Sequence, residues 1–403
     1  MQRTVLAPEP GRVPEPDPPA GLPALPELVA HLAAVAARTE PEPPGGSPPL
    51  RTAACAYWQR RGLATAPDQV LAAPGAPGLL LALLAAAGGE VLLSRPCSEW
   101  YAPQARLLGR AVHHTPGTAE SGGAPDAFAL LETVRRVRMT GGEPRVVVLS
   151  VADDPTGTCP PPELLHEVCE AAAGEGLWII SDETRRDTLH DPHETVLLSP
   201  AEMLPEHVVI LTDLRAGLVP SSWPAALARF PDTVRGAALH AATLAILTDL
   251  CTPLPGPLAG AVGHALTEPT SVRRRVAAAA RVHGTLATAV HQVLTRSGAV
   301  CRPPRAGSHL YADFEPVRRS LAAHGVTGPR ELERELAPWS ARGGHRFGDD
   351  PQALRVRLST DALLGPDVNH RQRVLRATHP LQVPHVSDAL TTLSARLTEL
   401  TEG

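Results

Sequence analysis

The sequence predicts an α/β fold built on a mostly parallel sheet, and residues 145–223 carry this prediction. Three short apolar runs in this stretch are rich in β-branched residues, which is typical of strands buried on both faces: 145–151, 177–181 and 208–212. A helical pattern from Pro160 to Glu175 separates the first two runs, with its prolines confined to the first turn. A strand, a helix and a second strand in this order form a unit whose two strands are parallel.

Polar residues follow each of these three strands. Asp154-Pro155-Thr156-Gly157 comes after the first strand, Asp182-Glu183 ends the second, and Asp213-Leu214-Arg215 ends the third. Ligands of open α/β sheets bind outside the carboxyl ends of the strands, which meet at one edge of the sheet. We therefore expect these polar residues to share one site.

The part of the chain before this unit is expected to begin with a proline-rich segment. Residues 1–24 are rich in proline with Asp and Glu between, a composition that predicts no fixed structure, and 40–49 is a second proline-rich linker. Apolar residues at helical spacing and one buried apolar run predict the remaining elements up to residue 144. These elements are helices at 25–38, 51–61, 74–86 and within 124–141, and a strand at 90–94.

Beyond Trp223 the pattern is first helical and then changes to that of a second, smaller unit. Helices are predicted at 235–252 and 262–297, and the second is long enough to bridge two domains. Strand and helix patterns then alternate, with a strand at 307–314, a helix at 330–336 and a strand at 353–359. We therefore expect a large domain followed by a small one.

Composition argues against several classes of function. The formal charge of the 403 residues is −5, which gives no reason to expect a nucleic acid or an anionic membrane as partner. There is no apolar run long enough to span a membrane, and the N-terminus lacks the apolar core of a signal peptide, so we expect a cytoplasmic protein. The six cysteines include no Cys-x-x-Cys pair, and His190 and His193 lie on a predicted loop. We expect neither a disulfide framework nor a metal site.

The motifs at the strand ends resemble, in the same order, those of the class I/II aminotransferases. Asp154-Pro155-Thr156-Gly157 is similar to the family's Asn-Pro-Thr-Gly, and Ser181-Asp182-Glu183 contains its Asp-Glu pair. Thr212-Asp213-Leu214-Arg215 is similar to its Ser-x-Ser-Lys. The resemblance covers residues 46 to 400, and the family consists of fold-type I enzymes that use pyridoxal phosphate.

The resemblance implies a particular domain arrangement and assembly. Residues 61–297 are expected to form a large domain around a mostly parallel, seven-stranded sheet. Residues 25–60 and 298–403 are expected to form a smaller α+β domain. Members of the family are homodimers with the site at the interface, so the resemblance also implies a homodimer.

The sequence departs from the family at the residue on which the family's chemistry depends. The lysine that forms a Schiff base with pyridoxal phosphate falls at Arg215, and all 37 residues counted as Lys+Arg are arginine. A lysine amine can lose its proton and attack an aldehyde, whereas a guanidinium stays charged and cannot. No side chain of these 403 residues can therefore form the family's aldimine, and we expect no covalently bound cofactor.

Among the family's other cofactor contacts, the resemblance implies that one is kept and several are changed. Asp182 is at the position of the carboxylate that pairs with the pyridinium nitrogen. Asp154 replaces an amide donor and Arg185 replaces a hydroxyl, both beside the phenolic oxygen of the ring. Ser98 falls where an aromatic ring stacks on the cofactor. Trp100 either substitutes for that ring or packs in the core or an interface.

The resemblance also assigns positions to the contacts with the cofactor phosphate and with the substrate. The turn around Ala76 matches the phosphate-binding turn, but Pro77 removes one backbone N–H from it. Trp223 stands where a phosphate-binding arginine is expected. Arg355 falls at the family's arginine for the substrate α-carboxylate, a bidentate contact that suits a guanidinium.

Two hypotheses for function remain open from the sequence. The first is a pseudo-aminotransferase that has lost transamination and keeps a cleft in which Arg185, Arg215 and Arg355 suit a small carboxylate ligand. The alternative is a related enzyme that uses pyridoxamine or pyridoxal phosphate noncovalently, or that carries out a cofactor-independent reaction on an amino or keto acid. Either protein could form a homodimer, or a heteromer with a lysine-bearing relative.

Overall fold

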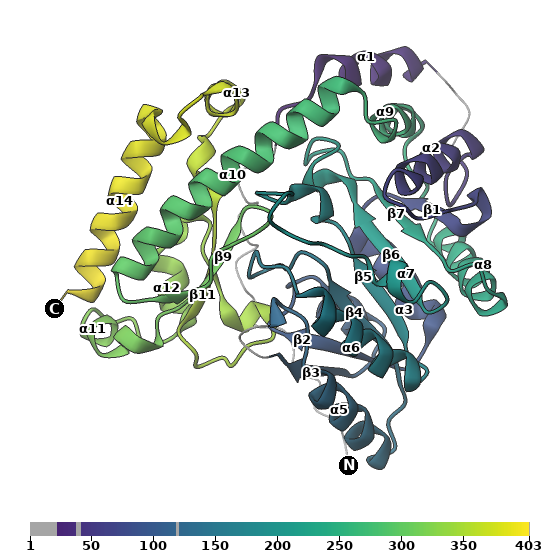
Figure 1. The fold of residues 1–403 in the computed structure, drawn as a ribbon, viewed down its shortest axis with the longest axis horizontal. Helices are drawn as coiled ribbons and strands as arrows, with labels where there is room; N and C mark the ends of the chain where they lie inside the picture. Colours follow the sequence, from purple (N-terminus) through teal and green to yellow (C-terminus); the bar gives the residue numbers. More distant parts are fainter. Residues whose placement is uncertain (1–21, 38–41, 118–120, 403) are drawn as a thin grey trace.

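The computed structural model describes residues 22–37, 42–117 and 121–402, so the predicted disordered segment 1–24 lies outside the described residues except for its last three. A seven-stranded sheet forms the centre of the large domain, with strand order β1-β7-β6-β5-β4-β2-β3 (Figure 1). β7 is antiparallel to both of its neighbours, and the other neighbouring strands are parallel. The bounds are β1 Val70–Ala73, β2 Glu90–Arg95, β3 Val112–Pro116, β4 Pro144–Ser150, β5 Trp178–Asp182, β6 Val208–Asp213 and β7 Ala226–Arg229. The predicted α/β class is confirmed.

Alternate residues of the central strands enter two hydrophobic cores, one on each face of this sheet. In β4, Val147 and Leu149 belong to one core and Val146 and Val148 to the other. Because helices cover both faces, these strands are apolar throughout rather than alternating with polar residues. The first core packs under α5 Ala127–Met139, α6 Pro162–Gly174, α7 Pro200–Met203 and α9 Gly256–Leu266, and the second under α3 Ala76–Ala87, α4 Tyr101–Leu107 and α8 Val234–Asp249.

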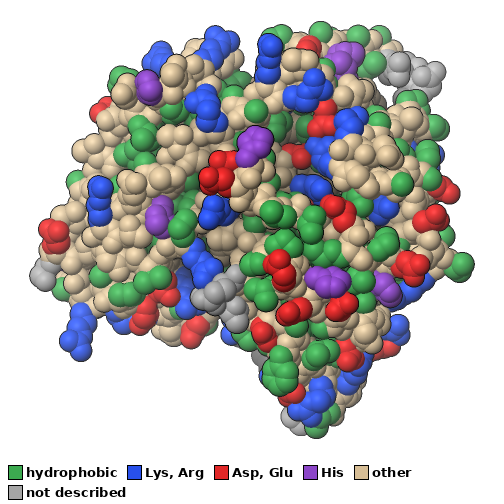
Figure 2. Space-filling view, viewed as in Figure 1, with side chains coloured by type: hydrophobic (Ala, Val, Ile, Leu, Met, Phe, Trp, Pro, Cys, Tyr) green, Lys and Arg blue, Asp and Glu red, His purple; other side chains and the backbone are tan. Residues whose placement is uncertain are grey.

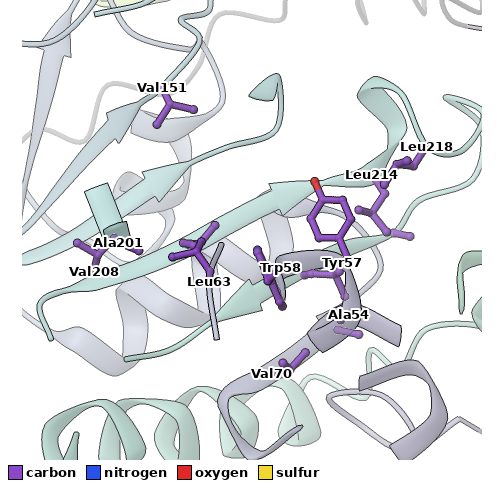
Figure 3. Close-up of a cluster of buried hydrophobic side chains, with 14 of the residues drawn as sticks. Ala54, Tyr57, Trp58, Leu63, Val70, Val151, Ala201, Val208, Leu214 and Leu218 are labelled. Carbon is purple, nitrogen blue, oxygen red and sulfur yellow. The ribbon is translucent and has the colours of Figure 1, made fainter. Parts of the chain in front are cut away.

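The N-terminal helices pack on the large domain, which corrects the domain division that the resemblance implied. α1 (Pro26–Val35) and α2 (Pro48–Gln59) both contact α9. Figure 3 shows Tyr57 and Trp58 of α2 in one cluster with Val208 of the central sheet. Residues 25–60 therefore belong with the large-domain core and not with the small domain, because the apolar faces of α1 and α2 are buried against α9 and the sheet.

The small domain has its own antiparallel sheet and its own core. The strand order is β10-β11-β9-β8, and helices cover this sheet (Figure 1). The strands are β8 Val300–Cys301, β9 His309–Asp313, β10 Arg342–Gly343 and β11 Arg355–Ser359. The helices are α11 Arg318–Ala323, α12 Pro329–Glu335, α13 Val368–Arg376 and α14 Pro384–Thr401.

One long helix joins the two domains, and it is shorter than predicted. The expected helix at 262–297 is divided between α9, which ends at Leu266, and α10 (Thr270–Arg296). Pro269 causes the break, because the residue before a proline is disfavoured in helical geometry, and Glu268 has a φ of +52°. α10 then crosses from one domain to the other (Figure 1), with Val272 in the large-domain core and Leu286 in the small-domain core.

Charged side chains of both signs are mixed over the face shown in Figure 2, without one continuous basic surface on that face. Within the described ranges, no helix has the length and apolar character needed to cross a membrane.

Candidate functional site: an arginine-lined cleft

A cleft of about 420 Å³ lies where the carboxyl edge of the large sheet meets α10 and the small domain. The loops after β4, β5 and β6 contribute to it, as the sequence predicted from the polar residues at those strand ends. α10 and the strands β9 and β11 supply the opposite wall. Its ionisable side chains are Asp154, Arg185, Asp213, Arg215, His283, His309, Arg357 and Asp361.

Asp154 makes the largest set of polar contacts described in the cleft, with residues from both domains. One carboxylate oxygen, Oδ1, accepts from Arg357 Nη1 at 2.9 Å and from His309 Nδ1 at 3.0 Å. The other oxygen, Oδ2, accepts from the Ser98 hydroxyl at 3.0 Å and lies 3.6 Å from Arg185 Nη2. A carboxylate from the large domain thus connects the two domains, because Arg357 comes from β11 and His309 from β9.

The charges around Asp154 determine the protonation of both Asp154 and His309. Burial alone would raise the pKa of the Asp154 carboxyl, but Arg357, His309 and Arg185 hold that pKa well below its usual range. Burial, together with the same two guanidiniums, lowers the pKa of His309 to about 4. At neutral pH, Asp154 is therefore ionised and His309 is neutral. Because a carboxylate only accepts, the imidazole proton is on Nδ1.

Arg215 is held by the residue two positions before it. Its Nε and Nη2 donate to the two carboxylate oxygens of Asp213 at 2.9 and 2.7 Å, a bidentate pair within one short turn. The hydrogen bond to Asp213 raises the pKa of Arg215, although partial burial opposes this. Asp213 Oδ2 also accepts from the backbone N–H of Ala76, the first residue of α3, at 3.1 Å. An anion supplied by the chain itself is thus bound at the N-terminus of α3.

The carboxylate of Asp182 also accepts hydrogen bonds from other groups of the chain. The hydroxyl of Tyr101 donates to its Oδ2, and the backbone N–H of Thr184 donates to its Oδ1 at 2.9 Å. The carboxylate is 6% exposed, and burial raises the pKa of Asp182. Asp182 is not among the residues that line the cleft. Trp100 does line it, and its ring packs edge-on against the ring of Tyr101 with 4.6 Å between centroids.

The arginine that faces the cleft from the small domain is Arg357 and not Arg355. Arg355 lies outside the cleft, where its guanidinium donates to Asp313 and Asp349, both at 2.9 Å. Arg357 is only 7% exposed and lines the cleft. The two residues are two positions apart in β11 and share a face of the strand, so spacing alone could not distinguish them. The two arginines differ in the carboxylate that each one meets, because Asp313 is directly opposite Arg355 in the register of β9 and β11.

The structure therefore brings together some of the expected site residues and separates others. Asp154, Arg185, Arg215 and Ala76 line the cleft, while Ser98 lies behind Asp154 and only contacts it. The resemblance did not indicate four other polar residues that line the cleft, which are His283, Ser308, His309 and Asp361. A signal for His309 was present, because it is an imidazole inside the strand predicted at 307–314. Across the described ranges, no three His, Cys, Asp or Glu side chains are grouped as metal ligands.

At the positions that the resemblance implies for pyridoxal phosphate, four features leave few groups available to hold it. The carboxylate expected at the ring nitrogen already accepts from Tyr101 and Thr184. The first backbone N–H of α3 already donates to Asp213, and Pro77 has no N–H to offer. Trp223, at the expected phosphate-binding arginine, packs against the large-domain core. Asp154 would place a second negative charge beside the phenolate of the ring.

Comparison with known proteins identifies the fold and the family. The model of the family "Aminotransferase class I and II" matches residues 13–212. The probable aspartate/prephenate aminotransferase of Thermus aquaticus is 26% identical over 201 residues, which are 49% of this chain and only 50% of that protein's own length. The aspartate/prephenate aminotransferase of Thermus thermophilus is 24% identical over 293 residues, 72% of each chain.

The solved structures agree over a larger part of the chain. A tetra mutant of Thermus thermophilus aspartate aminotransferase superposes with a TM-score of 0.77 at 19% identity and covers 94% of both chains. The structure of that enzyme with maleate has the same TM-score and identity and covers 95% of this chain and 90% of the other. The fold is that of the fold-type I aminotransferases, and the family model over residues 13–212 and the curated relatives support the class I and II aminotransferase family.

Proposed function

We propose that this protein is a pseudo-aminotransferase whose cleft binds a small carboxylate ligand. One observation carries the proposal: Arg185 and Arg357 come from opposite walls of the cleft and meet at one carboxylate, Asp154, with Glu99 a more distant second partner of Arg357 at 3.9 Å. The three arginines of the cleft are matched by three aspartates, so the proposal rests on guanidinium N–H donors that line the cleft and not on a surplus of positive charge. A guanidinium suits a carboxylate in particular, because its planar donors match two oxygens at once.

The state of Arg357 supports the same proposal. Among the described residues its buried Nε has no hydrogen-bond partner. An unpaired buried donor costs about 1–3 kcal/mol, so a ligand or a water that satisfied it would be favoured. The role that the sequence analysis gave to Arg355 therefore passes to Arg357.

The loss of transamination rests on the chemistry of the chain and on the contacts of Asp213. The sequence has no lysine for an aldimine, and Arg215 stays charged beside Asp213. The carboxylate of Asp213 at the N-terminus of α3 disfavours a phosphate there, because two anions would compete for one N–H. Noncovalent use of pyridoxal or pyridoxamine phosphate is disfavoured for the same reason.

Assembly and location remain proposals that rest on the family. We expect a homodimer, and a heteromer with a lysine-bearing relative is the less simple version of the same idea. Light scattering on the purified protein tests the first, and co-purification from native extract tests the second. The cytoplasmic location stays a prediction.

The binding proposal is tested by titration calorimetry with maleate, a dicarboxylate that is present in the structure of the Thermus thermophilus neighbour. A charge-assisted contact contributes about 1.5–3 kcal/mol, so Arg357→Gln should weaken binding roughly tenfold or more. Arg355→Gln is the matched control, because it removes an arginine of the same strand whose partners lie outside the cleft. The proposal fails if neither maleate nor 2-oxoglutarate binds, or if both variants weaken binding equally.

A further inference from the structure

His309 has one ring nitrogen whose role the contacts within the cleft leave open. Its Nδ1 donates to Asp154, but within the described part of the chain its Nε2 has no hydrogen-bond partner. The Nε2 atom is also absent from the fully buried polar atoms that lack a partner, and the residue lines the cleft. Nε2 is therefore an unprotonated nitrogen with access to the space in which a ligand would lie.

The pair formed by Asp154 and His309 has the arrangement of a positioned general base. A carboxylate that accepts from one nitrogen fixes the tautomer and the ring orientation, and it stabilises the imidazolium after the other nitrogen takes a proton. The guanidiniums of Arg185 and Arg357 contact the same carboxylate, so a ligand bound to them would be next to His309.

We propose that His309 acts as a general base that removes a proton from the carbon next to the carbonyl of a 2-keto acid, without a cofactor. The proposal rests on the carboxylate site proposed above, which would hold the acid group on Arg185 and Arg357. A 2-keto acid is the class that fits, because its carbonyl oxygen is adjacent to its carboxylate and would be close to a guanidinium as well. A guanidinium there stabilises the negative charge that develops on this oxygen.

The step needs no further reactant. The C–H bond breaks and its proton moves to Nε2 of His309, while the electron pair of that bond forms a carbon–carbon double bond. The π pair of the carbonyl moves to its oxygen, which gives an enolate. The reverse step returns a proton to carbon, and in D₂O the returned hydrogen is a deuteron, so the net result is exchange.

The charges around His309 make its basicity depend on the ligand. The groups that face it are Asp154 from the loop after β4, Arg185 from the loop after β5, Arg357 from β11, Asp361 after β11 and His283 from α10. Burial, Arg357 and Arg185 lower the pKa of His309 to about 4 in the free protein. A ligand carboxylate on the two guanidiniums would cancel part of their effect and raise this pKa towards the ordinary value of about 6.5.

The test is deuterium exchange into pyruvate, followed by the decrease of its methyl signal in proton NMR with purified protein in D₂O. The full-length protein should accelerate exchange above a heat-inactivated sample, and His309→Gln should reduce the acceleration by about 100-fold or more, as expected for a general base. His324→Gln is the control, because His324 is an exposed histidine at the end of α11. The rate should fall as the pH falls through the range between about 4 and 6.5, where the base becomes protonated.

A second measurement uses the wild-type protein, so that its result does not depend on whether His309→Gln folds. Wild-type protein is treated with diethyl pyrocarbonate, and mass spectrometry shows whether the loss of exchange follows the modification of His309. The inference is overturned if wild-type protein gives no acceleration, or if the rate does not depend on His309 in either experiment. Calorimetric titration with pyruvate and maleate separates the two proposals: binding without exchange rejects only the general base, whereas absence of exchange and of binding of either acid rejects the carboxylate site as well.

Discussion

Replacing Asp154 by Asn should destabilise the protein and, at the same time, strengthen its binding of a carboxylate. The change keeps the shape of the side chain but removes the charge that Arg357 and Arg185 share. The amide that results is the group that the family carries at this position. Stability and affinity should therefore change in opposite directions.

The size of the stability loss follows from the contacts. Asp154 makes close charge-assisted contacts with Arg357 at 2.9 Å and with His309 at 3.0 Å, and its side chain is 14% exposed. Removing one partner of a buried pair costs about 3–5 kcal/mol. With an unfolding entropy of about 2.1 cal/mol/K per residue, 403 residues give roughly 0.85 kcal/mol/K, so the Tm should fall by about 4–6 °C.

The affinity should change because Asp154 competes with the ligand for the same donors. Without its charge, the N–H groups that Arg357 and Arg185 direct at Asp154 bind a ligand carboxylate more strongly, and the Kd for maleate should decrease about tenfold or more. Asp388→Asn, on the exposed surface of α14, is the control for losing one negative charge elsewhere. Calorimetry and thermal unfolding on both variants are the assays. An unchanged Tm, or weaker maleate binding in Asp154→Asn, would show that Asp154 is not the shared counter-ion.

Three further changes follow from the same contacts. Arg215→Lys should not give transamination with aspartate or glutamate plus pyridoxal phosphate, because Asp213 would keep the new amine protonated; turnover in a coupled assay would contradict this. Asp213→Ala should free the N–H of Ala76, so that inorganic phosphate raises the Tm of the variant and not of the wild type; an equal response in both proteins would argue against Asp213 as the occupant. His309→Gln should change the pH dependence of stability. The pKa of His309 is about 4 in the folded protein and about 6.5 when unfolded. Its contribution is therefore fully present above pH 6.5 and is lost, by up to roughly 3 kcal/mol, as the pH falls to 4. Denaturation of both proteins across this range should show the stability advantage of the wild type shrinking, and parallel curves would refute the assignment.

The sequence was sufficient to predict most of the helices and strands because these depend on local patterns of apolar and polar residues. Buried β-branched runs located β4, β5 and β6, and the polar residues after them were placed at one edge of the sheet. The break before α10 was missed, although the polar run at 267–271 and Pro269 within it were visible signals. The packing of α1 on α9 was missed because a helical pattern shows that a face is buried and not against which partner.

The site was less predictable because its contacts join residues that are distant in the sequence. The hydrogen bond from Ala76 to Asp213 spans 137 positions, and that from Tyr101 to Asp182 spans 81. No spacing rule indicates such pairs. The choice of Arg357 over Arg355 likewise depends on which carboxylate each arginine meets in the folded chain.

The carboxylate of Asp213 at the start of α3 also acts as a tethered competitor. It is fixed to β6 beside the N–H of Ala76, so its effective concentration there is that of an intramolecular group, about millimolar or higher. A free phosphate displaces the side chain only when its concentration relative to its own dissociation constant exceeds the corresponding ratio for the tethered carboxylate. Competition from within the chain would thus raise the apparent Kd of a phosphate-bearing cofactor at this helix N-terminus.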